Sequence, residues 1–415
     1  MPKATIQTRA VAHAGELQAA NELMGKVFAH SFDDTVQWMR HVGSAYPGFR
    51  IEHTRVAYVD GDLAGTLRIT SDTIRIGEAR LHMGGFGWIA TAAHHRNKGV
   101  ASALIDDGIR YMRERSYHVS MLFGIPNFYH RFGFTTTLAE YATRLDVRDL
   151  PRYQGPSFRV RAIKPGDVRL LQKMHEQSDA GTACSIIRCG AHFNYHWKQW
   201  ENARVVMTPE GRVVGYFLID RRSGYANPRR ALGNTLEVEE AGVLQRANCP
   251  MVVEAAARHA RENLLSEVLF CAPPGDPLIE YLHQFRSRHT MELTRGEGGM
   301  LSVVNLPETL ESMVPEWESQ LARHGGREFD TELTLQIDSV PYLVRCHHGA
   351  VSIHRQSGKN KLALSGEEFV HLLTGYRHLP EIASTRRRII TAEGMRLAAC
   401  LFPKRHPYVW RVDRF

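Results

Sequence analysis

The sequence predicts an α/β protein with α+β character, in which one structural unit is used twice and is followed by a smaller third region. The stretches RVAYVDGDLAGTLRIT (55–70) and RVVMTPEGRVVGYFLID (204–220) both read as strand, turn and strand, and they begin about 149 residues apart. A strand, a turn, a helix and a short apolar strand follow each hairpin. The shared order of elements predicts an internal repeat.

In the first copy, the turn at Asp60 and Gly61 separates two alternating apolar runs, which predicts the hairpin. The run GFGWIATAA (85–93) is typical of a strand. After Gly99, apolar or small residues recur at helical spacing, which predicts a helix with one buried face; these are Ala101, Leu104, Ile105, Gly108 and Met112. HVSMLF (118–123) predicts the closing strand.

The second copy has lost the glycine of the first. With the 149-residue offset, Gly99 corresponds to Asn248, and SEVLF (266–270) corresponds to the closing strand. Proline and glycine punctuate the chain at 149–158 and at 294–299, which indicates boundaries. Residues 331–355 predict strands and residues 367–376 a short amphipathic helix. We expect three domains: 1–153, 154–297 and 298–415.

Composition narrows the class of protein. The six cysteines among 415 residues form no CxxC pair, which favours a reducing compartment and predicts neither disulfides nor a zinc site. Cys346, His347 and His348 lack a second ligand pair and are interpreted as surface. No apolar run reaches membrane-spanning length, so a cytoplasmic protein without a membrane partner is expected. The net charge of +8 is spread along the chain, which favours a solvated basic surface over nucleic-acid binding.

The residues between the 85–93 strand and the helix form a basic turn. Arg96 and Lys98 add charge to a helix start, where backbone N–H groups and the helix dipole attract anions. Gly99 lets an anion approach the backbone closely, and Ala101 keeps the wall low. The alternative is an ordinary helix start with solvated basic side chains.

The turn Arg96-Asn97-Lys98-Gly99-Val100-Ala101 resembles the pyrophosphate loop, R/Q-x-x-G-x-G/A, of the GCN5-related N-acetyltransferases. The stretch IPNFYHRFGF (125–134) resembles the second signature of that family, an Asn followed by a Tyr and then Gly-Phe. The resemblance implies acetyl-CoA as co-substrate and no metal. It also implies cofactor contacts from Ile89 and Thr91, from residues 96–101, and from Gly124 and Asn127.

A competent domain, a degenerate one and a small C-terminal domain together resemble the enhanced-intracellular-survival (Eis) family over essentially the whole chain. That resemblance implies a sterol-carrier-protein-like third domain, aminoglycoside-like or polyamine-like acceptors, and a homo-oligomer, often a hexamer. It also implies that the terminal carboxylate, here on Phe415, reaches the active site. Two features depart from the family: the turn holds fewer arginines than in many relatives, and the penultimate residue is Arg414 rather than an acidic one.

Transfer of acetyl from a thioester to an amine requires deprotonation of the amine, stabilisation of the oxyanion and protonation of the leaving thiolate. Tyr129 is the candidate acid, because a phenol with a pKa of about 10 is protonated at neutral pH. The alternative is a core aromatic residue. The Phe415 carboxylate is the candidate base, although a frayed terminus is the usual fate of a chain end. The Ile89 N–H is the expected oxyanion donor. No cysteine lies near the motif, which favours direct transfer.

The acceptor pocket is expected near residues 28–39. There Asp33 and Asp34 would attract an amine, and Phe32 and Trp38 would form walls; an exposed acidic helix start is the alternative. Two other functions remain open at this stage. One is acetylation of protein lysines, and the other is a non-enzymatic protein that binds an apolar ligand and keeps relic acetyltransferase domains.

Overall fold

The computed structural model describes residues 5–28, 45–150, 153–197, 200, 202–219, 234–324, 330–383 and 390–415. These residues form two seven-stranded sheets and one four-stranded sheet, which confirms the predicted fold class. The chain divides into two compact units, which are described separately. The first comprises residues 1–137, 294–405 and 415, and the second comprises 138–293 and 406–414.

The first unit is built on a mixed sheet with the order β1-β2-β3-β4-β5-β14-β6. Only the β4–β5 pair is parallel among the pairings given for the described strands of this sheet. The strand bounds are β1 Ile6–Ala10, β2 Thr54–Val59, β3 Asp62–Ile76, β4 Ala79–Thr91, β5 Val119–Gly124, β6 Thr135–Leu138 and β14 Gly298–Val303. The helices of this part are α1 Ala14–Phe28, α3 Val100–Glu114, and the short η2 Ile51–His53, η3 Ala93–His95 and η4 Tyr129–Phe132.

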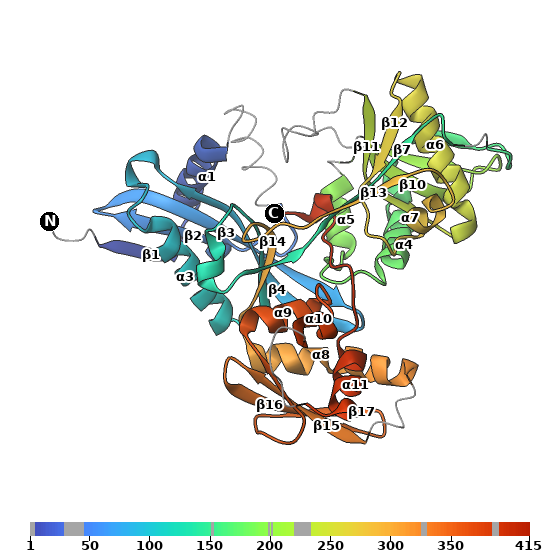
Figure 1. Ribbon diagram of the computed structural model, residues 1–415. Coiled ribbons are helices and arrows are strands. Elements are labelled where there is room, and N and C mark those ends of the chain that lie inside the picture. The colour runs from blue at the N-terminus through green and yellow to red at the C-terminus, as the bar shows by residue number, and fades with distance from the viewer. Residues whose placement is uncertain are drawn as a thin grey trace. The chain divides into compact units, whose positions relative to one another are not determined.

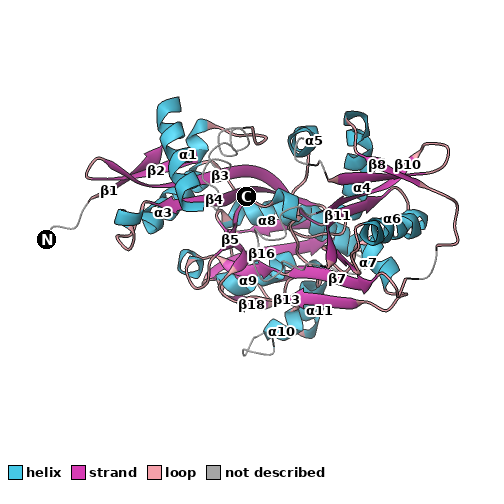
Figure 2. Ribbon diagram, turned by 90° about the horizontal axis from the view of Figure 1, so that it is seen from above, coloured by secondary structure: helices cyan, strands magenta, loops and turns pink. Residues whose placement is uncertain are grey.

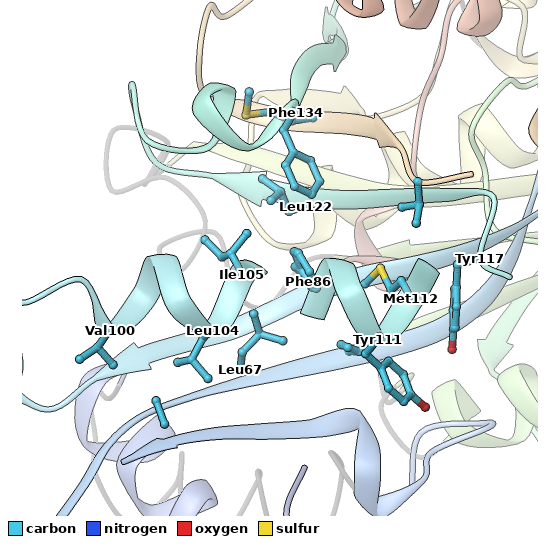
Figure 3. Close-up of a cluster of buried hydrophobic side chains, with 14 of the residues drawn as sticks. Leu67, Phe86, Val100, Leu104, Ile105, Tyr111, Met112, Tyr117, Leu122 and Phe134 are labelled. Atoms are coloured by element: carbon cyan, nitrogen blue, oxygen red, sulfur yellow. The ribbon is translucent and has the colours of Figure 1, made fainter. Parts of the chain in front are cut away.

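Helices α1 and α3 lie on opposite faces of this sheet (Figures 1 and 2). The alternation along β3 explains the two faces, because successive side chains of a strand point to opposite sides. Leu67 and Ile69 face α3 and join the main core cluster (Figure 3). The predicted helix face is confirmed in Leu104, Ile105 and Met112, which are fully buried in that cluster.

The first unit also contains the predicted third region. Its sheet has the order β17-β16-β15-β18, with bounds β15 Thr331–Ile337, β16 Val340–His347, β17 Ala350–His354 and β18 Lys361–Leu364. The helices are α8 Leu306–Arg323, α9 Gly366–Thr374, α10 Leu379–Ala383 and α11 Ala392–Leu401. Helices α8 and α11 pack on the sheet (Figure 1). A capping box between Ser365 and Glu368 begins α9, the helix predicted at 367–376.

The second unit repeats the pattern of the first. Its sheet has the order β13-β7-β12-β11-β10-β9-β8. The strand bounds are β7 Glu140–Asp146, β8 Arg159–Ala162, β9 Ala203–Met207, β10 Val213–Ile219, β11 Thr235–Val243, β12 Glu267–Phe270 and β13 Arg288–Glu292. The helices are α4 Val168–Asp179, α5 Gly190–Trp197, α6 Cys249–Glu262 and α7 Pro277–Leu282, with the short η5 Pro165–Asp167, η7 Arg246–Asn248 and η9 Arg411–Asp413. As in the first unit, β11 and β12 are parallel and α6 connects them.

Two strands are exchanged relative to chain order. Strand β7 follows β6 directly in the sequence but pairs with β12 and β13 of the second sheet. Strand β14 follows β13 but pairs with β5 of the first sheet. The expected boundaries after residues 153 and 297 divide the chain into consecutive segments. The two large sheets instead exchange β7 and β14, so their strands do not follow these segments. Within the described residues, no helix is long and apolar enough to cross a membrane.

Candidate active site

The basic turn lies between β4 and α3, as predicted. Gly99 immediately precedes the helix and has φ +88°, a left-handed conformation that glycine adopts without steric cost. Its carbonyl accepts a 3.0 Å hydrogen bond from the Ala103 N–H, so the helix is regular from its first turn. Arg96, Asn97 and Lys98 are exposed around it. Two cations and the N–H groups of a helix start therefore meet at one place, which is the geometry of an anion site.

The core holds this turn in position. Val100, the first residue of α3, is buried against the sheet together with Leu104 and Ile105 (Figure 3). Ala101 is half-buried and adds no more than a methyl group beside the turn. The predicted phosphate contacts therefore lie on a rigid helix start rather than on a free loop.

Strands β4 and β5 separate at their carboxyl ends. Their pairing begins at Met83 and Val119, and the last pair is Phe86 with Leu122. Strand β4 continues to Thr91 and β5 continues to Gly124. The backbone groups that would extend the ladder face this opening instead, and so they are available to a ligand.

A bulge interrupts β4 on its other side. The pairing of β3 with β4 shifts between Thr66 and Arg68, and Trp88 opposite this shift has φ +55°. Bulges bend a strand and re-aim its groups, and they occur often near active sites. Ile89, the predicted oxyanion donor, directly follows the bulged residue, and its side chain packs on the core. Thr91, the last residue of β4, is half-buried and pairs with Gly65.

Phe415 lies against β4 at the same opening. Its ring is close enough to Gly85 that a Cβ there would lie 2.4 Å from the ring, and its centroid is 6.0 Å from that of Phe123 on β5. A Cβ on Gly87 would lie 2.9 Å from the main-chain carbonyl carbon of Phe415. Glycine at 85 and 87 therefore makes room for residue 415, and the main-chain carbon of Phe415 lies where β4 and β5 diverge.

Tyr129, the first residue of η4, lies against β5, the other strand of the opening. Its ring packs so closely on Gly124, the last residue of β5, that a Cβ there would lie 2.4 Å away. Phe128 and Phe134 contact the ring edge-on at centroid distances of 4.9 and 6.4 Å. Tyr129 is half-buried, and this burial raises the pKa of its hydroxyl. The phenol is therefore protonated over an even wider pH range than an exposed tyrosine.

Asn127 is held by its backbone. It has φ +56°, and its N–H donates to the Gly296 carbonyl at 2.8 Å. Asn127 is exposed and Gly124 is half-buried beside Tyr129. The loop that carries the second signature is thus fixed by residues just before β14, a contact that the sequence did not reveal.

The predicted acceptor residues Phe32, Asp33, Asp34 and Trp38 lie outside the described residues. The structure adds a polar face that sequence reasoning missed. Thr70 contacts the same Cβ position of Gly85 as the ring of Phe415, and Arg68 pairs in register with Gly87. Asp72 follows on the same face, and the Tyr46 hydroxyl donates a bifurcated hydrogen bond to its two carboxylate oxygens, each 3.0 Å away. These three β3 residues are buried.

A signal for this face was present in the sequence. In TLRITSD (66–72), polar residues alternate with Leu67 and Ile69 inside a run that is otherwise typical of a core strand. Polar side chains on a buried strand face usually serve a partner or a ligand, since burial without one is costly. Only the register of β3 with β4 shows that this partner face lies next to Phe415.

Comparison with known proteins assigns a class to this domain. Residues 9–137 match the family model described as "Acetyltransferase (GNAT) domain". A search of curated protein sequences gives no match. The residues that match contain the basic turn, the opening and Tyr129. These residues therefore form a GNAT acetyltransferase domain, and the predicted enzyme class, an N-acetyltransferase, is confirmed.

Solved structures extend the similarity in fold to the whole chain. A GCN5-related N-acetyltransferase from Anabaena variabilis is 16% identical with a TM-score of 0.75, covering 99% of this chain and 100% of that one. A protein of unknown function from Enterococcus faecalis, described as a probable N-acyltransferase, is 14% identical with a TM-score of 0.76 over 99% and 100%. Eis1 from Mycobacterium abscessus is 13% identical with a TM-score of 0.65 over 99% and 100%. The chain is similar to these proteins in fold.

Proposed function

We propose that the protein transfers acetyl from acetyl-CoA directly to primary amines of small aminoglycoside-like or polyamine-like molecules. The observation that carries this proposal is that Tyr129 packs against the end of β5 and Phe415 packs against β4, at the place where these two strands diverge. The anion site at Gly99 begins the helix that connects these strands. A thioester between β4 and β5 would then have both groups beside it.

In this mechanism the chain's own groups hold the donor. The N–H groups at the start of α3, with Arg96 and Lys98, bind the pyrophosphate. Thr91, Gly124 and Asn127 line the pantetheine arm. The Ile89 N–H, which follows the bulge in β4, donates to the oxygen that becomes negative during the attack. We do not require a metal ion for any of these contacts.

The transfer itself requires removal of protons from the acceptor nitrogen and protonation of the leaving thiolate. The carboxylate of Phe415 takes a proton from the acceptor ammonium group, directly or through water, and the amine attacks the thioester carbonyl carbon. As the tetrahedral intermediate collapses, the C–S bond breaks and Tyr129 protonates the thiolate of CoA. The nitrogen loses its remaining extra proton, which returns through water to the phenolate of Tyr129. The N-acetylated amine and free CoA are the products, and no covalent enzyme intermediate forms.

The acceptor class is supported by charge. The carboxylates of Phe415 and of the buried Asp72 lie on the same sheet face, together with the opposing charge of the buried Arg68. The surplus of negative charge favours a cationic acceptor that reaches β4 from the α1 side. Phe32, Asp33, Asp34 and Trp38 remain the proposed further contacts. A sterol-carrier-like role for residues 298–415, assembly into a homo-oligomer such as a hexamer, and a cytoplasmic location belong to the same proposal.

Mass spectrometry of an acceptor panel tests this function. The full chain is incubated with acetyl-CoA and with aminoglycosides, linear polyamines, lysine-containing peptides and a neutral amino sugar. We expect mass gains of one or more acetyl groups on the polycationic small molecules, and none with the Tyr129→Phe, Gly99→Leu double variant. Acetylation of the peptides alone would identify a protein lysine acetyltransferase and contradict the proposed acceptor class. No product from any amine would contradict the proposed reaction.

A further inference from the structure

A cluster of possible metal ligands lies next to the basic turn. Asp62, the first residue of β3, and His94 and His95 of η3 each offer one ligand atom, and these atoms all lie within 4.8 Å of one another. The backbone holds the two segments together, because the Ala92 N–H donates to the Ala64 carbonyl at 2.9 Å. Ligands of a tetrahedral zinc ion lie about 3.4 Å apart, so small side-chain rotations bring the three groups to coordinating distance.

The environment of His95 is the second, independent observation. Its side chain is buried, with 6% of the residue exposed, yet neither ring nitrogen has a hydrogen-bond partner among the described residues. Buried polar groups nearly always have hydrogen-bond partners. A buried imidazole without one has lost its hydrogen bonds to water, and no other hydrogen bond compensates for that free-energy cost. A ligand at the ring nitrogens would remove this cost.

The donor atoms of this cluster suit a transition metal. Asp60 and Asp62 supply negative charge nearby, whereas Lys98 opposes a cation. Two imidazoles and a carboxylate are a donor set that suits zinc better than magnesium or calcium, which prefer oxygen ligands alone.

We propose that Asp62, His94 and His95 form a binding site for a divalent transition metal of the zinc class, with water completing a tetrahedral shell. The ion would join the β2–β3 hairpin to η3, the segment that leads into the basic turn at Arg96. Its role is structural, because none of the three residues belongs to the groups assigned to the transfer of acetyl. The site is thus independent of the proposed acceptor and of the catalytic groups.

Calorimetric titration with Zn²⁺ tests the site, using the full chain without a histidine tag after treatment with EDTA. We expect one ion per chain, and an accompanying rise in Tm, because an ion that binds only the folded state stabilises it. His95→Ala should weaken binding by at least about tenfold, the usual order for damage to a metal shell. Asp62→Asn should also weaken Zn²⁺ binding. Because Asp62 is exposed, this substitution is not expected to disturb folding.

The chain offers a matched control in the third region. His347 and His348 are also adjacent, and His347 contacts Asp330 at 2.8 Å, but both histidines are exposed. His347→Ala should leave the Zn²⁺ affinity unchanged. Absence of binding in the wild-type chain, equal affinity in His95→Ala or Asp62→Asn, or loss of the site in His347→Ala would each overturn the proposal. Circular dichroism of every variant verifies folding.

Discussion

At the scale of single residues, motif and geometry agree best at the two signatures. The sequence singled out Gly99, Gly124 and Tyr129, and the structure shows why the first two are glycines. Gly99 has φ +88°, and the ring of Tyr129 occupies the space that a side chain at Gly124 would fill. Arg68, Thr70 and Asp72 were not predicted as site residues, because their position beside Phe415 depends on the pairing register of β3 with β4.

Tyr129→Phe removes the proposed acid and keeps the ring that packs on Gly124. We expect kcat to fall by about 10²–10⁴-fold, the usual contribution of general acid catalysis, while the affinity for acetyl-CoA stays the same. Steady-state kinetics and calorimetry measure the two quantities. Because burial raises the pKa of Tyr129, the wild-type rate should fall only at a pH higher than the one at which an exposed tyrosine ionises. An unchanged kcat with a raised KM would make Tyr129 a binding residue.

Gly87→Ala tests the position of Phe415 from the opposite side. The new Cβ would lie 2.9 Å from the main-chain carbon of Phe415, so residue 415 has to move. A misplacement of about 1 Å costs up to roughly 10²-fold in rate, which is the loss of kcat expected here. Gly166→Ala is the control, since a Cβ there meets nothing within 4 Å. Full activity of the Gly87→Ala variant would show that the position of Phe415 does not matter for the transfer of acetyl.

At the scale of elements, the repeat predicted from the two hairpins is confirmed, and the structure explains why the copies differ. Asn248 has φ −90°, in the right-handed region, where Gly99 is left-handed. Pro250 follows at the start of α6 and has no N–H to offer an anion. The cavity beside β11 and β12 measures only about 10 Å³, with Asp276 in its wall. The second unit has therefore lost the turn, and this small cavity is found where β11 and β12 diverge.

The buried Asp276 makes the stability of the folded chain depend on pH. Burial raises the pKa of its carboxyl from 3.8 to about 7 in the folded chain. The folded state therefore holds the proton more tightly than the unfolded one, and stability falls as pH rises from about 4 to 7. Asp276→Asn keeps an acceptor for the 2.8 Å bond from the Leu278 N–H but cannot ionise.

We expect the Asp276→Asn chain to be more stable than wild type at about pH 8, by up to roughly 4 kcal/mol, and nearly equal at about pH 4. Thermal unfolding at the two pH values measures the difference. A Tm difference that is the same at both pH values would show that Asp276 does not titrate in this range.

At the scale of the whole molecule, chain order alone did not reveal which strands pair. The partners of β7 and β14 lie far away from these strands in the sequence. Strand β7 pairs with residues 267–270, more than 100 positions further on, and β14 returns to β5. Such long-range pairing is decided by tertiary packing, which no local pattern encodes. The boundaries after 153 and 297 and the oligomer remain predictions.

The last ten residues of the sequence are also divided between the two units. Residues 406–414 belong to the second unit, where Asp413 is buried and bonded to Arg188 at 2.8 Å, and Phe415 belongs to the first unit. If the Phe415 carboxylate is the base, adding two glycines after it should lower kcat by about 10²-fold or more with acetyl-CoA affinity preserved. Kinetics of the extended chain measure this loss. Full activity would transfer the role to another group, such as Asp72 or water.

The central claim is that the first acetyltransferase domain alone binds acetyl-CoA, at the turn around Gly99 and the opening between β4 and β5. Calorimetric titration of acetyl-CoA into three chains tests it most directly: the wild type, Gly99→Leu, and the matched second-turn variant Asn248→Gly. We predict one site per chain in the wild type and in Asn248→Gly, and severe loss of binding in Gly99→Leu, because leucine is strained at φ +88° and blocks the approach of the pyrophosphate. Two sites in the wild type, or undiminished affinity in Gly99→Leu, would contradict the claim.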